Sequence, residues 1–347
     1  MRKITCQNSK SRHSNCDEGT SNYNKEFCDR HILVFGEEMQ NRLSSLNIGI
    51  VAVGGLGILT TELLMRLFPR KLTWIEFDHI SKSNLNRFTG STIHDAKKET
   101  PKSTLASRLV RKFNREQEFV SINGNFLELQ NQEKFKECDY LFVTADSVAV
   151  RLAANQLCLA HGIPMLDLGT GASVGKTGLR SSGGQIIRIM PDSGFCLVCS
   201  ELYNLSDAMA EFMDDEEYKR QQDLGYVRGA DIPDPQVYAL NMMTASWAVW
   251  ILMRSVAGED LNFDVLAIDA LNFNTYIWTE KKRKPNNCPI CGSNGIVFGG
   301  DKVDFLLKDI DKTKTRSDSK VYCNSKLSDK KERSNAKIRS KSNQGKK

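Results

Sequence analysis

The sequence predicts an α/β fold with a doubly wound, mostly parallel sheet that antiparallel strands extend. Over the first 170 residues, short β-branched runs typical of buried strands alternate with helical patterns, which favours parallel strands joined by helices. The second half changes to a Gly-, Ser- and Thr-rich stretch over 169–184 and then to strand patterns at 185–190, 265–269 and 274–278. We expect the first of these later strands to be antiparallel.

The stretch 47–78 is the centre of the predicted fold. A β-branched run over 48–53 suits a strand buried on both faces. It ends in Gly54, Gly55 and Gly57, where missing side chains let the backbone approach a phosphate at the start of the next helix, which is expected over about 57–67. A second strand then ends at Glu76, at the spacing at which an acid meets a ribose hydroxyl in a βαβ unit. This order predicts a Rossmann-like nucleotide site rather than a purely structural turn.

Composition limits the classes of function. No apolar run reaches the roughly 18–20 residues that a membrane helix needs, and the polar N-terminus lacks the apolar core of a signal peptide, so we expect a cytoplasmic protein. The net charge of +6 comes from the C-terminus: residues 312–347 carry 13 Lys+Arg against 3 Asp+Glu, which leaves 35 against 39 elsewhere. A nucleic-acid role could therefore depend only on this tail, which we interpret as a solvated extension.

Three segments are expected. Residues 1–25 are polar without periodicity and are predicted to be a disordered N-terminal segment. Residues 26–300 are predicted to form the folded domain, and 301–347 a basic, disordered tail. Within the domain, we expect an apolar-faced helix over 237–256. Its stripe, which is typical of a core or a subunit interface, is made of Leu240, Met243, Trp247, Trp250 and Ile251.

Four of the ten cysteines form two CxxC pairs. Each pair presents two thiolates to one ion, and two such pairs match a tetrahedral zinc site. Four thiolates leave no open position on the ion, so the predicted zinc is structural. The ligands are Cys196, Cys199, Cys288 and Cys291.

A nucleoside triphosphate also needs cations for its phosphate oxygens and a carboxylate for Mg²⁺. Arg87 and Lys102 follow the nucleotide-binding strand and helix, so we expect them to reach the phosphates. Asp146 lies at the end of a further buried strand and could hold Mg²⁺, which one or two carboxylates usually bind together with phosphate oxygens. A helix N-cap is the alternative role for Asp146.

These motifs, in this order, resemble the ubiquitin-activating-type (ThiF/MoeB-like) adenylyltransferases, which include enzymes that activate sulfur-carrier proteins. The resemblance covers 30–151 and more loosely the chain to 292. The residues that carry it are Arg30-His-Ile, Gly54-Gly-Leu-Gly57, Glu76-Phe-Asp78, Ser83-Asn-Leu-Asn-Arg87, Pro101-Lys102, Thr144-Ala-Asp146-Ser-Val-Ala-Val-Arg151 and the two CxxC pairs.

The resemblance implies ATP, Mg²⁺ and Zn²⁺ as cofactors and a homodimer as the assembly. The implied partner is a small ubiquitin-fold or sulfur-carrier protein ending in Gly-Gly, whose terminal carboxylate attacks the α-phosphate of ATP to give an acyl-adenylate. The implied catalytic residues are Arg87, Lys102, Asp146 (with Mg²⁺) and, from the neighbouring subunit, Arg30. The implied nucleotide-binding residues are Gly54, Gly55, Gly57, Glu76 (on the ribose), Asp78 and Asn84.

Two departures from the family pattern affect the prediction. Ala52 stands where the family usually has its first glycine, which should tighten the turn without abolishing it. No cysteine lies between Cys199 and Cys288, where relatives that form a thioester or persulfide keep theirs, so we expect adenylation without a thioester on this chain.

Other functions stay open on the sequence alone. The same adenylation chemistry could act on another carboxylate, as in a modified tRNA base dehydratase or a peptide-maturation enzyme. A nicotinamide-dependent oxidoreductase shares the βαβ start, but a dinucleotide needs neither a metal carboxylate nor so many phosphate cations. A non-catalytic scaffold fits poorly with a full set of ATP-binding residues.

Overall fold

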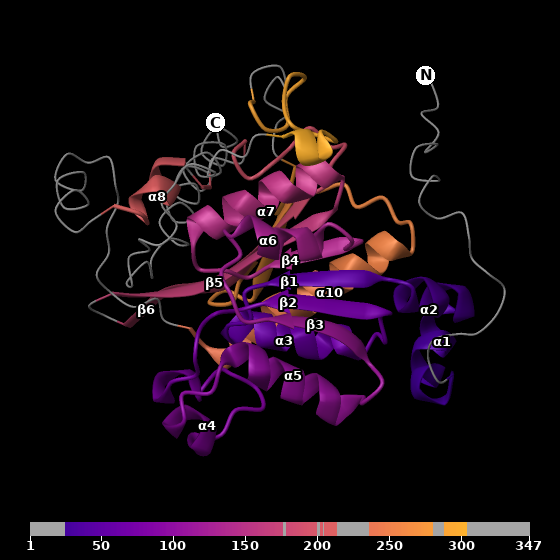
Figure 1. Cartoon of the computed structure of the whole chain (residues 1–347), viewed down its shortest axis with the longest axis vertical. Coiled ribbons are helices and arrows are strands. Elements are labelled where there is room, and N and C mark those ends of the chain that lie inside the picture. Colours follow the sequence, from indigo (N-terminus) through magenta and orange to yellow (C-terminus); the bar gives the residue numbers. More distant parts are fainter. Residues whose placement is uncertain are drawn as a thin grey trace, which may run out of the picture.

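The computed structural model describes residues 25–175, 178–199, 202–203, 205–213, 236–279 and 288–303. Their strands form a single sheet with helices on both faces (Figure 1). The predictions of disorder for 1–25 and 301–347 fall on residues that, apart from 25 and 301–303, lie outside this described part.

The sheet confirms the predicted doubly wound, mostly parallel arrangement. Its strand order is β3-β2-β1-β4-β5-β6-β7-β8, and the pairs from β3 to β5 are parallel. β1 is buried along its whole length, as the β-branched run predicted. The parallel strands are β1 (Asn47–Val51), β2 (Lys71–Ile75), β3 (Glu118–Ile122), β4 (Tyr140–Val143) and β5 (Met165–Gly175).

Three antiparallel strands extend the sheet: β6 (Gly178–Ile189), β7 (Val265–Asp269) and β8 (Asn274–Trp278). β5 and β6 continue into the Gly-, Ser- and Thr-rich stretch, further than the apolar patterns indicated. Neighbouring groups explain this composition. A Cβ at Gly183 would lie 1.9 Å from the carbonyl oxygen of Ile268, and one at Gly184 would lie 1.9 Å from Thr244 Oγ1. The strands therefore need glycine where β7 and a helix approach them.

Helices cover the two faces of the sheet separately. α3 (Gly55–Met65), α5 (Lys102–Phe113) and α10 (Tyr238–Val256) pack on one face, and α7 (Val148–His161) packs on the other (Figure 1). Alternate side chains of β4 serve the two cores, Phe142 on the α3 side and Leu141 and Val143 on the α7 side. The shorter elements are η1 (Lys25–Cys28), α1 (Asp29–Phe35), α2 (Glu37–Ser44), η2 (Lys82–Asn84), α4 (Ile93–Lys97), α6 (Leu129–Gln132), η3 (Glu133–Phe135), α8 (Leu205–Ala210) and η5 (Gly300–Lys302).

The methionine and the two tryptophans of the predicted stripe on α10 do not enter the core, although Ile251 of the same stripe does. Ala245 and Ala248 face the sheet and are fully buried, whereas Met243, Trp247 and Trp250 are 38–41% exposed. Of the two predicted roles, the core is wrong for these three side chains, and a subunit interface stays a prediction. Among the described helices, α10 included, the length and apolarity needed to cross a membrane are not reached.

A carboxylate from another segment holds the start of α7. Ser147 caps this helix by accepting a hydrogen bond from the Val150 N–H at 3.1 Å. Glu211, which follows α8, accepts hydrogen bonds from the Ser147 hydroxyl at 2.5 Å and from the Val148 N–H at 2.6 Å. Burial raises the pKa of Glu211 to about 7 despite these bonds and the nearby charge of Arg151.

The raised pKa predicts a pH-dependent stability contribution. Because the pKa of Glu211 is higher in the fold than its ordinary value of 4.5, its contribution is fully present below pH 4.5 and is lost as the pH rises through about 7. Glutamine does not titrate. We therefore expect the free energy of unfolding of the wild type to fall relative to that of Glu211→Gln between pH 5 and pH 8, as measured by urea denaturation. Glu116→Gln, at an exposed site, is the control, and an unchanged difference between wild type and Glu211→Gln across this range would contradict the assignment.

Candidate functional site

The predicted nucleotide- and phosphate-binding residues, without Arg30, follow the carboxyl ends of β1, β2 and β4. β1 lies between β2 and β4, and the chain leaves β1 toward β2 and β3 before it returns to β4. The strand order therefore reverses between β1 and β4, and in open α/β sheets ligands bind at such a switch point. The glycine turn follows β1, and Asp146 follows β4.

The glycine turn leaves the start of α3 open. Gly54 is the N-cap of α3, and no side chain of the described residues caps it. The first N–H groups of the helix are therefore free to bind an anion. Gly57 cannot be replaced without movement, because a Cβ there would lie 2.2 Å from the carbonyl oxygen of Ala52 and 2.6 Å from Thr144 Oγ1. Ala52 adopts a left-handed conformation with φ of 68°, so the turn forms with alanine in a conformation that favours glycine.

Glu76 joins the ends of β1 and β2. Its Oε2 accepts a hydrogen bond from the Val53 N–H, and its Oε1 accepts one from the Asp78 N–H, both at 2.9 Å. Burial raises the pKa of this carboxyl group, while the charge of Lys102 and the two N–H donors lower it. In this structure Glu76 fixes the turn, and its contact with a ribose stays a prediction.

Lys102 is held at the same edge by Asp78. The backbone N–H of Lys102, the first residue of α5, donates to the Asp78 carbonyl oxygen at 2.9 Å. Its Nζ lies 2.8 Å from Asp78 Oδ2, and its side chain is only 10% exposed. A nearly buried ammonium group therefore lies at the strand ends, directed to the carboxylates of Asp78 and Glu76.

Arg87 and Asp146 lie within electrostatic reach of each other. Burial lowers the pKa of Arg87, and the carboxylate of Asp146 raises it. The Arg87 side chain packs on the glycine turn, since a Cβ at Gly55 would lie 3.0 Å from its Cγ. Asp146 is exposed, and the N-cap of α7 is Ser147, so the alternative role of Asp146 as a helix cap is wrong.

Asn84 lies close to Arg87 in the sequence, whereas Arg30 lies at the opposite edge of the sheet. Asn84 ends η2, three residues before Arg87, and its Oδ1 accepts hydrogen bonds from the backbone N–H and the hydroxyl of Ser81. Arg30 is not brought to the cluster. Its helix, α1, packs on α2, which leads into the amino end of β1 and thus lies at the opposite edge of the sheet (Figure 1).

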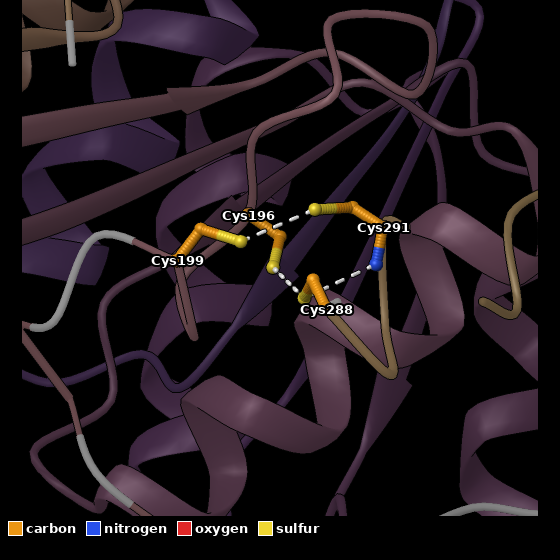
Figure 2. Close-up of side chains that lie close together, drawn as sticks. All are labelled: Cys196, Cys199, Cys288 and Cys291. Atoms are coloured by element: carbon orange, nitrogen blue, oxygen red, sulfur yellow. Dashed lines mark hydrogen bonds between the residues drawn. The ribbon is translucent and has the colours of Figure 1, made fainter. Parts of the chain in front are cut away.

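The two CxxC pairs meet on the α7 side of the sheet. The four sulfur atoms lie within 4.8 Å of one another, although the pairs are about 90 residues apart in sequence (Figure 2). The Cys196 and Cys288 sulfurs are 3.8 Å apart, and those of Cys199 and Cys291 are 3.3 Å apart. A tetrahedral zinc ion with bonds of about 2.3 Å separates its sulfurs by about 3.8 Å. The donor set and its spacing therefore fit a closed metal site.

Two polar residues near the carboxyl ends of the strands were not among the residues predicted from the sequence. Asn241 on α10 is fully buried, and its Oδ1 accepts a hydrogen bond from the Thr170 hydroxyl at 2.6 Å. Glu211 holds the start of α7, next to Asp146. A polar residue in the first half of a mostly apolar helix was the available signal for Asn241.

Known proteins are similar to this chain in sequence and in fold. The chain is 29% identical over 167 residues to the sulfur carrier protein ThiS adenylyltransferase of Bacillus subtilis. The matched region covers 47% of this chain and 46% of that protein. The chain is 26% identical over 275 residues to the SAMP-activating enzyme E1 of Haloferax volcanii, covering 77% of this chain and 88% of that protein. The chain spans less than half of the length of several curated relatives, the Bacillus protein among them.

A solved structure with the same fold is the microcin C7 biosynthetic enzyme MccB in complex with N-formylated MccA. It superposes with a TM-score of 0.62 at 17% identity and covers 79% of this chain and 77% of that chain. The family model described as the ThiF family matches residues 28–291, which include the glycine turn, the cluster at the strand ends and both CxxC pairs. The chain therefore belongs to the ThiF family.

Proposed function

We propose that this protein is an ATP-dependent adenylyltransferase that activates the C-terminal glycine carboxylate of a ubiquitin-like or sulfur-carrier protein. The observation that carries the proposal is the convergence at one sheet edge of an uncapped helix start, two cationic side chains and an exposed carboxylate. This set matches the needs of a metal-bound triphosphate. ATP use is also what membership of the ThiF family leads us to expect.

Each residue has a role in this proposal. The start of α3 receives a phosphate, and Glu76 lies beside it where a ribose hydroxyl would bind. Lys102 and Arg87 bind phosphate oxygens and stabilise the negative charge that develops as the carboxylate oxygen attacks the α-phosphorus and the bond to pyrophosphate breaks. Asp146 would hold Mg²⁺, which neutralises phosphate charge when bound. Its exposed carboxylate, which caps no helix, is compatible with this role.

The class of substrate is supported by the relatives. The names of the Bacillus, Haloferax and Escherichia coli proteins describe activation of a sulfur carrier, of SAMP and of molybdopterin synthase. A peptide carboxylate is the second candidate, because the fold is also that of MccB in its complex with MccA. Both candidates require the same attack of a terminal carboxylate on ATP.

The proposal predicts pyrophosphate exchange into ATP that depends on a free carboxylate. We expect exchange with a carrier protein ending in Gly-Gly, and none with the same carrier bearing a C-terminal amide, because an amide lacks the attacking oxygen. Lys102→Ala and Asp146→Asn should each lower the exchange rate about 100-fold, since each removes charge stabilisation from the transition state. Radiolabelled pyrophosphate incorporation measures the rate.

Lys98→Ala is the matched control, because Lys98 is an exposed lysine close to the start of α5. Its exchange rate should equal that of the wild type. Exchange with a short peptide but with no Gly-Gly carrier would replace the first substrate class by the second. Background exchange with every carrier and peptide tested would refute adenylation itself.

The cysteines support activation without a thioester on this chain. Outside the CxxC pairs, the described part of the chain contains Cys28, Cys138 and Cys158, all buried. Burial raises the pKa of Cys28 to about 11 and that of Cys138 to about 12, and it also raises the pKa of Cys158. Such thiols remain protonated and are poor nucleophiles. We therefore expect the product to stay an acyl-adenylate, without a thiol-sensitive adduct in a gel of the reaction.

We propose that the four-cysteine cluster holds a structural zinc ion. The four sulfurs would occupy all positions of a tetrahedral ion, and the ion would tie the segment after β6 to the segment after β8. Because the two pairs are far apart in sequence, the bound metal closes a long loop and stabilises the fold.

Metal analysis tests this assignment. We expect about one zinc ion per purified chain by mass spectrometry, and its loss with a lower melting temperature in Cys196→Ser and Cys288→Ser. Cys28→Ala removes a buried thiol outside the cluster and should keep the zinc. Zinc retained at the wild-type level in both serine variants would contradict the site.

We propose a homodimer that uses the α1/α10 surface, defined by Leu33, Val34, Met243, Trp247 and Trp250. Leu33 and Val34 are 74% and 71% exposed, and the rings of Phe35 and Trp250 lie 5.9 Å apart, so α1 and α10 meet next to exposed apolar side chains of both helices. Such patches mark interfaces. Arg30 lies one helical turn before this face, in a place from which a partner's site could be reached.

Sedimentation tests the surface. We expect the wild type to sediment as a dimer at micromolar concentration and Trp247→Glu to associate about tenfold or more weakly, because it would bury a charge. Leu129→Glu changes an apolar residue that is 48% exposed on α6, away from this surface, and should leave the dimer intact. A monomeric wild type, or equal dimerisation of both variants, would exclude this interface.

A further inference from the structure

We propose that Asn241 is a further binding residue of the site, whose side-chain amide donates a hydrogen bond to a phosphate oxygen of the nucleotide at the start of α3. The proposal rests on the proposed use of ATP. It adds a contact from α10, an element that none of the predicted nucleotide-binding residues belongs to.

The first observation is a buried donor. Asn241 is 0% exposed, and its orientation is set by the Thr170 hydroxyl, which donates to Oδ1 at 2.6 Å. With the oxygen engaged, Nδ2 points the other way, and within the described part of the chain it has no hydrogen-bond partner. A buried amide N–H without a partner is costly, and native proteins contain few of them.

The second observation is the direction of this donor. A Cβ at Gly55, the first residue of α3, would lie 3.0 Å from Asn241 Nδ2 and 3.0 Å from Arg87 Cγ. The Asn241 amide and the Arg87 side chain therefore both pack against Gly55, the first residue of α3. That start has no side-chain cap among the described residues, and its N–H groups carry the positive end of the helix dipole.

An anion satisfies all these donors together. A phosphate oxygen can accept from the N–H groups of α3 and from an amide beside them, and it lies next to the Arg87 side chain. A neutral donor adds a hydrogen bond to the phosphate without adding a positive charge that would repel a bound metal ion. A carboxylate in its place would repel the phosphate.

The same helix offers a matched control. Thr244, one turn after Asn241, is also fully buried, and its Oγ1 also lacks a partner within the described residues. Its hydroxyl packs against Gly184 on β6 rather than against the start of α3. Substitution of Asn241 and substitution of Thr244 would therefore each remove a buried polar group from α10, but only Asn241 lies next to Gly55.

Calorimetric titration of the full chain with Mg-ATP and with adenosine tests the assignment. We expect Asn241→Ala and Asn241→Asp to weaken ATP binding about tenfold or more, with the larger effect for aspartate, because a hydrogen bond to a charged group is lost or replaced by repulsion. Adenosine has no phosphate, so its affinity should stay within about twofold of the wild type. Thr244→Val should bind both ligands like the wild type.

The outcomes separate the inference from the proposed function. Wild type that binds no ATP would overturn the proposed function, and the inference with it. Wild type that binds ATP while both Asn241 variants bind it equally well would overturn the inference alone. An equal loss of ATP and adenosine affinity would assign Asn241 to packing. Should Asn241→Asp not fold, the Asn241→Ala and Thr244→Val pair gives the same comparison.

Discussion

The two hydrogen bonds that the Glu76 carboxylate accepts are the constraint on which the site depends. They connect the chain after β1, at Val53, to the chain after β2, at Asp78. The first bond fixes the turn that leads into α3. The second fixes the residue whose side chain and carbonyl oxygen hold Lys102 at the start of α5. One buried acid thus sets the relative positions of two helix starts and of the cation that we propose to bind phosphate. Burial of this carboxylate is costly, and the two N–H donors and the charge of Lys102 offset that cost.

The cations of the site are positioned before any anion binds. Lys102 is held by Asp78, and Arg87 is held by the carbonyl oxygen of Ser83 and by Gln236. Side chains that are already ordered lose little conformational entropy on binding, so more of the interaction energy is available to the ligand. The cost is that Lys102 and Arg87 must exchange their present partners for the ligand or share them with it. Because Asp78 and the Arg87 guanidinium are partly exposed, this exchange does not leave a buried charge without a partner.

Local patterns predicted the first half of the fold and much of the site. The strand, glycine turn and helix around Gly54 are encoded within a few residues, and the CxxC spacing fixes the pairing of thiolates by itself. The proximity of Arg87 and Asp146 followed from a rule of parallel sheets, whose strand ends share one edge. What failed depended on contacts between distant segments. Ser147 rather than Asp146 caps α7, and the partner of Ser147, Glu211, is 64 residues away.

The same distance explains why Asn241 escaped sequence reasoning. It meets Thr170 across 71 residues, and its position beside Gly55 exists only because α10 packs on α3. The lengths of β5 and β6 were missed for a related reason. Gly183 and Gly184 on β6 add nothing to an apolar pattern, yet the approach of β7 and α10 requires residues without side chains at these positions. The periodicity of apolar residues indicates which face of a helix or strand is buried, but it does not indicate which other element packs against that face.

The four-cysteine cluster and the proposed nucleotide site are connected through α7. The Leu197 N–H, inside the first CxxC pair, donates to Asn155 near the middle of α7, and Glu211 binds the first turn of that helix. Leu197 and Glu211 therefore contact α7 at two levels. A third link runs from Arg151 on α7 to the buried carboxylate of Asp167 on β5. Asp146 directly precedes this helix, so its position at the switch point is determined by how firmly α7 is held. A metal ion that fixes the cysteine segment would stabilise the chain and, through these contacts, keep the proposed magnesium ligand in place.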